Sequence, residues 1–431
     1  MYSLPGVVTV LRMSPVSKGR KPKKSARSAG RRARSQPVVQ AESAFASLQR
    51  LLGSKERPGW FDDSIRRTID GAPVLVDAAG PRELEQLTAE LVGTQLYRAI
   101  HDAGKGLWFD RWLAELADAC RRRLEESVGG DDWRPFFWLL HGIAAIAPPA
   151  LVPALPSRGF VKSLPADSEP PRWLSDATRI AATGEIWRMR DRYGTRYAVI
   201  AGFRYPRGNG EYVLQLDIDT SGFVTLEGVQ VVDDVAQAEA SWRDAVGDSA
   251  AQAQPEPVTA ADQLLCLVHL DPADEACIRG DESRSVIDNW FRADRLIREL
   301  REVMRKRRMP LPAAANLYRD IDITVMTHPF AEWRAAAGVV EPNSEAVDAL
   351  AAEWMEGTTP ETWFSVSPRR VEFQLGLIGD WIVDEITTEA LALMPTWVRW
   401  LGERADLPAD LQERVITAAS TPVALSGVHD R

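Results

Sequence analysis

The chain has 431 residues, of which 45% are hydrophobic and 26% are charged, and these proportions are typical of a globular protein. At this length two or three domains are expected rather than a single core. Three scattered cysteines exclude a disulfide framework and favour a reducing cytoplasm, and no hydrophobic run reaches the roughly 18 residues that span a bilayer.

Charge is distributed unevenly along the chain. The net charge is −9, but ten basic residues and no acidic residue lie between Arg12 and Arg34. The other 42 basic and 61 acidic residues leave the rest of the chain at −19. Residues 1–40 are rich in Lys, Arg, Ser and Pro, which predicts a disordered basic arm. Met1 and Met13 are alternative starts for this arm.

The arm has two interpretations, a solubilising tail or a segment that makes weak contact with nucleic acid or an acidic partner. Contact with phosphates would depend on salt, because each neutralised phosphate releases counterions. The candidate contact residues of the arm are Lys18, Arg20, Lys21, Lys23, Lys24, Arg31 and Arg32.

Residues 41–147 have helical periodicity and predict a helical domain of four or five helices. In one of these helices Pro81 is the first residue, and leucines follow at helical spacing as far as Gly104. His101 and His141 lie on apolar helices and are interpreted as core histidines. Residues 148–172 are rich in proline, which blocks regular structure, and predict an extended linker.

Residues 173–250 predict a small α+β domain. The segments EIWRMRDR, YAVIAGFR, EYVLQLDI and FVTLEGVQVV have the composition and alternation of strands, and short turn sequences separate them. Connections this short favour an antiparallel meander. The helix expected from DDVAQAEASWRDAVG follows and would cover one face of the sheet.

The stretch DIDTSGFVTLEG at 217–228 opens like a calcium-binding EF-hand loop. Asp217, Asp219, Ser221 and Gly222 match the first half of that motif, but its twelfth position is Gly228 rather than Glu. The flanking segments alternate as strands do, whereas an EF-hand requires helices. The stretch is therefore interpreted as the turn of a β-hairpin, in which Asp bonds to nearby backbone.

Residues 251–431 begin with the end of a low-complexity spacer, AAQAQPEP, then return to helical periodicity and predict a C-terminal helical domain. Within it, Ser367 as N-cap and Pro368 as first helical residue predict the start of one helix. The predicted fold is α+β and mainly helical, with two helical regions that flank the small antiparallel domain. On the helix expected within 283–308, basic residues recur every three or four positions opposite an apolar face. They form either a stripe that contacts phosphates or an acidic partner, or a solvated helix face. The stripe consists of Arg292, Arg295, Arg298, Arg301, Arg305 and Arg308.

Two groups of residues are candidates for metal chemistry. Cys266, His269 and Cys277 are Zn²⁺-type ligands, but the usual Cys-x-x-Cys pair is missing and LLCLVHL favours a buried segment. Asp320 and Asp322 share a face if their segment is extended, and His328 is near in sequence. These three suit a metal-dependent hydrolase or nuclease, with Asp271 or His269 as further ligands, or else a polar loop before a helix.

The head SKGRKPKK, the Ala/Arg/Asp-rich composition and the closing WVRWLGERADLPADLQERVITAA resemble large uncharacterised proteins of high-GC actinobacteria. The resemblance implies a cytoplasmic bacterial setting, and it supplies no activity and no catalytic residue. No common catalytic or nucleotide-binding motif occurs in the sequence. The leading hypothesis is thus a cytoplasmic interaction or adaptor protein without a cofactor, and the alternative is the Asp/His hydrolase or nuclease.

Overall fold

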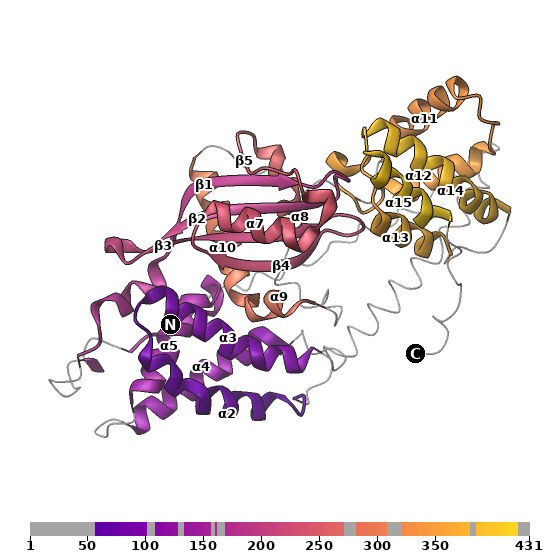
Figure 1. Ribbon diagram of the computed structural model, residues 1–431. Helices are drawn as coiled ribbons and strands as arrows, with labels where there is room; N and C mark the ends of the chain where they lie inside the picture. The colour runs from indigo at the N-terminus through magenta and orange to yellow at the C-terminus, as the bar shows by residue number, and fades with distance from the viewer. Residues whose placement is uncertain are drawn as a thin grey trace, which may run out of the picture.

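The fold confirms a mainly helical α+β protein, in which helices flank an antiparallel sheet (Figure 1). The basic arm predicted for residues 1–40 lies outside the part of the chain that the structure describes. The computed structural model describes residues 57–100, 108–127, 133–156, 160–161, 169–270, 282–307, 317, 321–379 and 385–420.

The N-terminal helices are α2 (Phe61–Gly71), α3 (Pro81–Ala99), α4 (Phe109–Glu126) and α5 (Arg134–Ile146). Helix α3 begins at Pro81 after an extended Gly80, as the sequence predicts, because proline needs no amide hydrogen at a first helical position. Every residue of α5 from Phe137 to Ile146 is buried, in keeping with its apolar composition. His141 is among them, and its Nδ1 lies 2.9 Å from the carbonyl oxygen of Phe137.

The sheet contains the predicted meander and one additional short strand. Strand order is β4-β3-β2-β1-β5, and each pairing is antiparallel. The extra strand, β5, lies in a segment that the sequence indicates is a spacer, because two residues are too few to show alternation. The strands are β1 (Ala181–Arg190), β2 (Arg196–Arg204), β3 (Glu211–Asp219), β4 (Thr225–Val232) and β5 (Glu256–Pro257).

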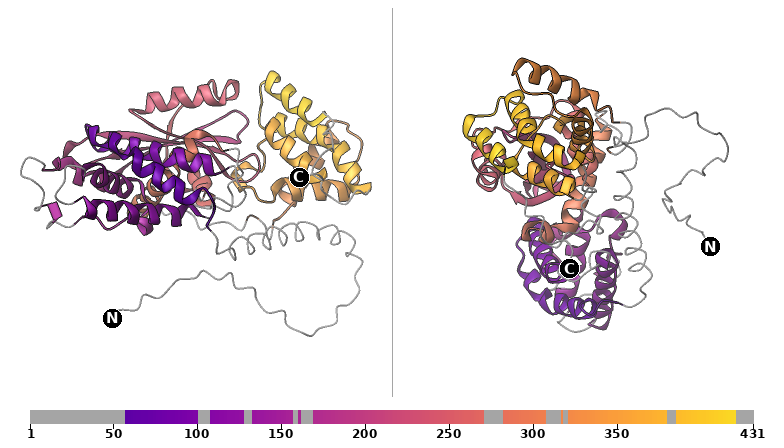
Figure 2. Two further views of the ribbon diagram at one scale, coloured as in Figure 1. Left: turned by 90° about the horizontal axis from the view of Figure 1, so that it is seen from below. Right: turned by 90° about the vertical axis from the view of Figure 1, so that its right-hand side faces the viewer.

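The two faces of the sheet contact different partners. One face packs against α7 (Val235–Val246) through Ile200, Val213 and Trp242. Asp234 caps the start of α7 by accepting a hydrogen bond from the backbone of Gln237 at 2.8 Å. The opposite face contributes to a larger core that also includes the N-terminal helices, so Figure 2 shows the sheet between α7 and those helices.

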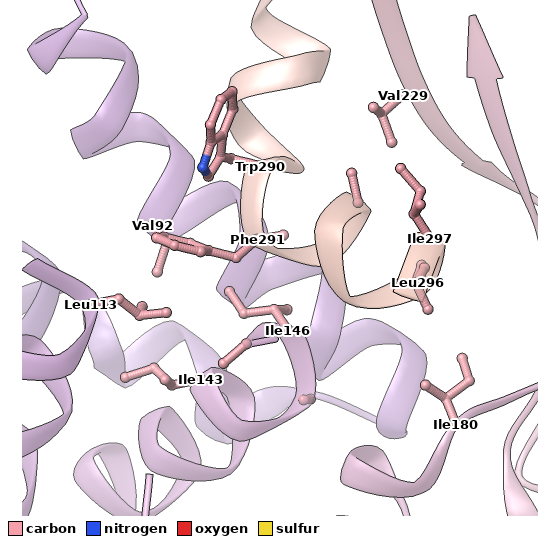
Figure 3. Packing of buried hydrophobic residues seen from close by; sticks show 14 of the residues in the cluster. Val92, Leu113, Ile143, Ile146, Ile180, Val229, Trp290, Phe291, Leu296 and Ile297 are labelled. Carbon is pink, nitrogen blue, oxygen red and sulfur yellow. The ribbon is translucent and has the colours of Figure 1, made fainter. Parts of the chain in front are cut away.

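Helix α10 (Trp290–Lys306) connects the sheet to the N-terminal helices. It follows two short helices, α8 (Leu265–His269) and α9 (Arg284–Asp288). Trp290 and Phe291 point toward the N-terminal helices, whereas Ile297 points toward the sheet near Val229 (Figure 3). Sheet and N-terminal helices therefore share one apolar core, although the segment that joins them lies late in the sequence.

The C-terminal helices form a bundle with an apolar core of its own beside one end of the sheet (Figure 1). Ser367 caps the third of them as predicted, since the backbone N–H of Arg370 lies 3.2 Å from its hydroxyl oxygen. None of the helices in the described part of the chain is long and apolar enough to cross a membrane. The bundle consists of α11 (Thr324–Ala336), α12 (Ser344–Met355), α13 (Pro368–Gly379), α14 (Glu385–Arg404) and α15 (Ala409–Ser420).

Candidate functional site

The DIDTSG stretch is the turn of a β-hairpin, as the sequence predicts. Strand β3 ends at Asp219, which pairs with Thr225 at the start of β4. The carboxylate of Asp219 accepts a hydrogen bond from the backbone N–H of Ser221 at 2.6 Å, which is the local bond expected of Asp in a turn.

The acidic side chains of this turn bind arginines. Arg196 donates to both carboxylate oxygens of Asp217, at 2.7 and 2.8 Å. Arg369, at the start of α13, lies 2.9 Å from Asp219 and 2.9 Å from Glu227. The motif thus joins the end of the sheet to the C-terminal bundle through ion pairs.

Two of the Asp/His candidates, Asp322 and His328, lie just before and within the first turns of α11. Asp322 accepts hydrogen bonds from the backbone N–H and the hydroxyl of Thr324, at 3.1 and 2.6 Å. These bonds, followed by the charge of His328, lower the pKa of Asp322. Asp320 lies outside the described residues. The hydrolase alternative that uses these residues stays a prediction.

Two of the Cys/His candidates, Cys266 and His269, lie in α8. Cys266 is buried in α8, and burial raises the pKa of its thiol to about 12. His269 ends the same helix, and burial lowers the pKa of its imidazole. Cys277 and Asp271 lie outside the described residues. Within the ranges that the structure describes, no three His, Cys, Asp or Glu side chains gather as a metal site would require.

The inner arginines of the stripe predicted on α10 are buried or half-buried and are bound by other groups of the protein. Arg292 is only 2% exposed and donates to Asn289 and Gln86 at 2.7 and 2.8 Å. Arg295 donates to two backbone carbonyls from distant segments, at 2.9 and 2.8 Å.

The outer part of the stripe is also paired within the protein. Arg298 binds Asp294 at 2.7 Å and Arg305 binds Glu302 at 2.7 Å, one helical turn away in each case. Arg301 donates to the carbonyl oxygens that end α8. Arg308 lies outside the described residues. Arg292, Arg295 and Arg301 therefore position helices, and contact between the stripe and a partner stays a prediction.

A buried polar network lies beneath one side of the sheet, and its carboxylate and tyrosines are not among the sites predicted from the sequence. Glu85 of α3 is 1% exposed and accepts hydrogen bonds from the hydroxyls of Tyr205 and Tyr212, at 2.6 and 2.9 Å. Arg292 lies 3.6 Å from the same carboxylate. Burial, followed by the charge of Glu85, raises the pKa of both tyrosines, so their hydroxyls remain donors.

One signal for this network was present in the sequence. Glu85 follows Leu84 and precedes Thr88 and Val92 by three and seven residues, so it lies on the buried face of α3. A carboxylate at such a position needs buried donors, but the sequence does not show which residues supply them.

A groove of about 550 Å³ lies between α3, the edge of β4 and the α9–α10 corner, and Arg292 of this network is one of its lining residues. Its lining residues include Gln86 and Glu90 from α3 and Val229 to Val232 from β4. Arg284 and Asp288 form the opposite rim and bind each other at 2.7 Å. The volume is in the range of ligand-binding clefts, ~300–1,000 Å³.

Comparisons of the chain with models of protein families, with curated proteins and with solved structures find no match.

Proposed function

We propose that this is an interaction or adaptor protein of the cytoplasm, and that its basic arm contacts nucleic acid. The arginines of α10 are the second cationic group that the sequence indicates. Each of them that the structure describes is bound to a carboxylate or a carbonyl oxygen of the protein itself. The excess positive charge of the chain is thus in the arm, whereas the remainder carries −19.

Charge segregation of this kind suits an arm that binds a polyanion while the body stays clear of it. Phosphates attract the arm, and the acidic body is repelled by the same polymer. An acidic protein partner is the second form of this proposal, because its carboxylates would meet the same Lys and Arg side chains. The two forms differ in salt dependence, since counterion release from a nucleic acid gives a steep slope.

The proposal is tested by deleting residues 1–40. The shortened protein is expected to lose retention on heparin and binding to a fluorescent single-stranded RNA, with no change in its melting temperature. For the intact chain, the logarithm of the RNA-binding constant should fall with the logarithm of salt concentration by about 0.7 per phosphate contacted. Polyglutamate, used as a second probe, distinguishes the acidic-partner form.

Two control variants sharpen this test. A chain that starts at Met13 keeps nine of the ten basic residues and should bind RNA as the full chain does. Arg305→Gln changes an exposed arginine of α10 that already pairs with Glu302, and it should leave RNA binding unchanged. Equal heparin retention before and after deletion of residues 1–40 would refute the proposal.

A further inference from the structure

The groove beside β4 contains an open stretch of sheet edge. In the described part of the chain, β4 is an edge strand with β3 as its neighbour. Leu214 pairs with Val231 and Leu216 pairs with Val229. Along an antiparallel strand, the backbone N–H and C=O groups of successive residues point alternately toward the neighbouring strand and away from it. The backbone groups of Val229 and Val231, two residues apart, therefore point the same way.

The contacts of Val229 show that this direction is outward. Its N–H lies 3.4 Å from the hydroxyl of Ser285, and its carbonyl oxygen accepts from the side-chain amide of Asn289 at 3.3 Å. Both partners belong to the α9 region rather than to a strand. The N–H and C=O of Val231 therefore point away from β3 as well, into the groove.

Side chains occupy the place of a further strand along most of this edge. The hydroxyl of Ser283 donates to the carbonyl of Glu227 at 2.8 Å, and the N–H of Asp233 donates to Gln237 at 2.9 Å. Such cover protects an edge strand from pairing with other chains. Val231 lies between the covered positions, and no group in the described ranges pairs with its outward N–H and C=O. One residue of an extended chain fits this gap with two backbone hydrogen bonds.

We propose that the groove binds a short extended peptide of a partner protein, which adds to β4 opposite Val231 and carries Lys or Arg at the paired position. Paired residues in a sheet place their side chains on the same face. Val231 shares its face with Val229, which packs in the core between the sheet and the α3 side. The paired side chain of the peptide would therefore point toward α3.

The charges that line the groove select a basic side chain. Arg284 is bound to Asp288 and to Thr94, and Arg292 is bound to Asn289 and Gln86. Glu90 is exposed on the α3 wall and receives a hydrogen bond from Gln86 at 2.6 Å, on one of its two carboxylate oxygens. Its other oxygen is available to a cation, and the charge of −19 outside the arm attracts basic segments over a longer range.

The peptide proposal goes beyond the proposed contact of the arm and is tested separately. The probe is a fluorescein-labelled pentapeptide with the sequence Thr-Val-Lys-Val-Thr and blocked ends, and binding to the full chain is followed by fluorescence anisotropy. We expect saturable binding below about 1 mM. Methylation of the backbone nitrogen of the peptide lysine removes one of the two hydrogen bonds and should weaken binding about tenfold.

Two substitutions at Val231 form a matched pair. Val231→Pro removes the outward N–H, and it spares the ladder to β3 because proline is tolerated where an edge N–H faces away from the sheet. Val231→Thr keeps that N–H and the branched shape. We expect about tenfold weaker binding for the proline variant and little change for the threonine variant. Glu90→Gln should weaken the lysine peptide but not a version with norleucine in place of lysine.

Several results would overturn the peptide proposal. These are absence of saturable binding, equal binding of the methylated peptide, and full affinity in a Val231→Pro protein that melts as the wild type does. If the proline variant fails to fold, the methylated peptide still decides the question. A dimer that Val231→Pro abolishes, without peptide binding, would assign the groove to a second copy instead. RNA binding by the arm is unaffected in each case, so failure of one proposal leaves the other to be judged separately.

Discussion

The sheet is joined to its two helical neighbours by different chemistry. Toward the N-terminal helices the contact is apolar and continuous, with Trp290 and Phe291 of α10 buried in the shared core. Toward the C-terminal bundle it is mainly polar. Arg369 binds the β3–β4 hairpin, Ser221 lies 3.2 Å from Ser367, and the turn after β1 inserts Tyr193 into the core of the bundle.

This difference indicates which of the two contacts, or joints, of the sheet responds to salt and pH. The sheet and the N-terminal helices should unfold together because they share one apolar core. Burial of apolar surface responds less to salt and pH than ion pairs do. Ion pairs at a partly exposed interface are weakened by salt, and buried carboxylates respond to pH. The joint with the C-terminal bundle should therefore loosen under conditions that leave the other intact.

Trp290→Ala should give the largest effect, a loss of about 3–5 kcal/mol in the free energy of unfolding, because it leaves a cavity in the shared core. The Trp290 ring lies 5.8 Å from the Phe109 ring, centroid to centroid, so the cavity would open between α10 and α4. Urea unfolding followed by circular dichroism measures the loss. Phe223→Ala is the contrasting variant at the polar joint, where Phe223 is 54% exposed and its ring lies 5.6 Å from that of Phe373 in α13, and it should cost about 1 kcal/mol. Equal losses in the two variants would remove the contrast.

Asp191 should make the polar joint sensitive to pH. It lies in the turn that carries Tyr193, and burial raises its pKa from 3.8 to about 6 despite hydrogen bonds from the backbone of Thr195 and Arg196 and from Ser249. A carboxyl group with a raised pKa in the folded state stabilises the fold most below its unfolded pKa. That contribution is lost as pH rises through the folded pKa.

Between about pH 4 and pH 7, the wild type should therefore lose roughly 2–3 kcal/mol relative to Asp191→Asn, which does not titrate. Urea unfolding of both proteins at several pH values gives this difference. A difference that is constant across the pH range would show that Asp191 does not titrate with a raised pKa.

Arg369→Gln should have the smallest effect, about 0.5–1 kcal/mol, because the arginine is 47% exposed and water screens its pairs with Asp219 and Glu227. The loss should shrink between about 0.05 M and 0.5 M salt. Thermal unfolding at the two salt concentrations measures it. Arg66→Gln, which removes an exposed pair within α2, is the matched control, and its effect should be smaller still.

Local features of this protein followed from the sequence because neighbouring residues decide them. Ser367 and Pro368 start a helix by capping and by a fixed backbone angle, and the DIDTSG stretch turns because the Asp219 carboxylate bonds to the backbone N–H two residues later. The meander follows from alternation and short connections. The two residues of β5 were missed, since strand alternation cannot be recognised over so short a segment.

The tertiary structure alone decided which polar side chains are buried and which groups they bind. Periodicity places Arg292 opposite the apolar face of α10, yet α3 covers that side and supplies Gln86 and Glu85 as partners. Periodicity likewise places Glu85 on the buried face of α3, but its donors are Tyr205, directly after β2, and Tyr212 of β3, more than a hundred residues later. The sequence by itself determined the elements and the separation of charge, because propensity, capping and composition are local properties. Burial of a charge depends on which distant segments pack against it, so the network beneath the sheet and the open edge of β4 became visible only in the folded chain.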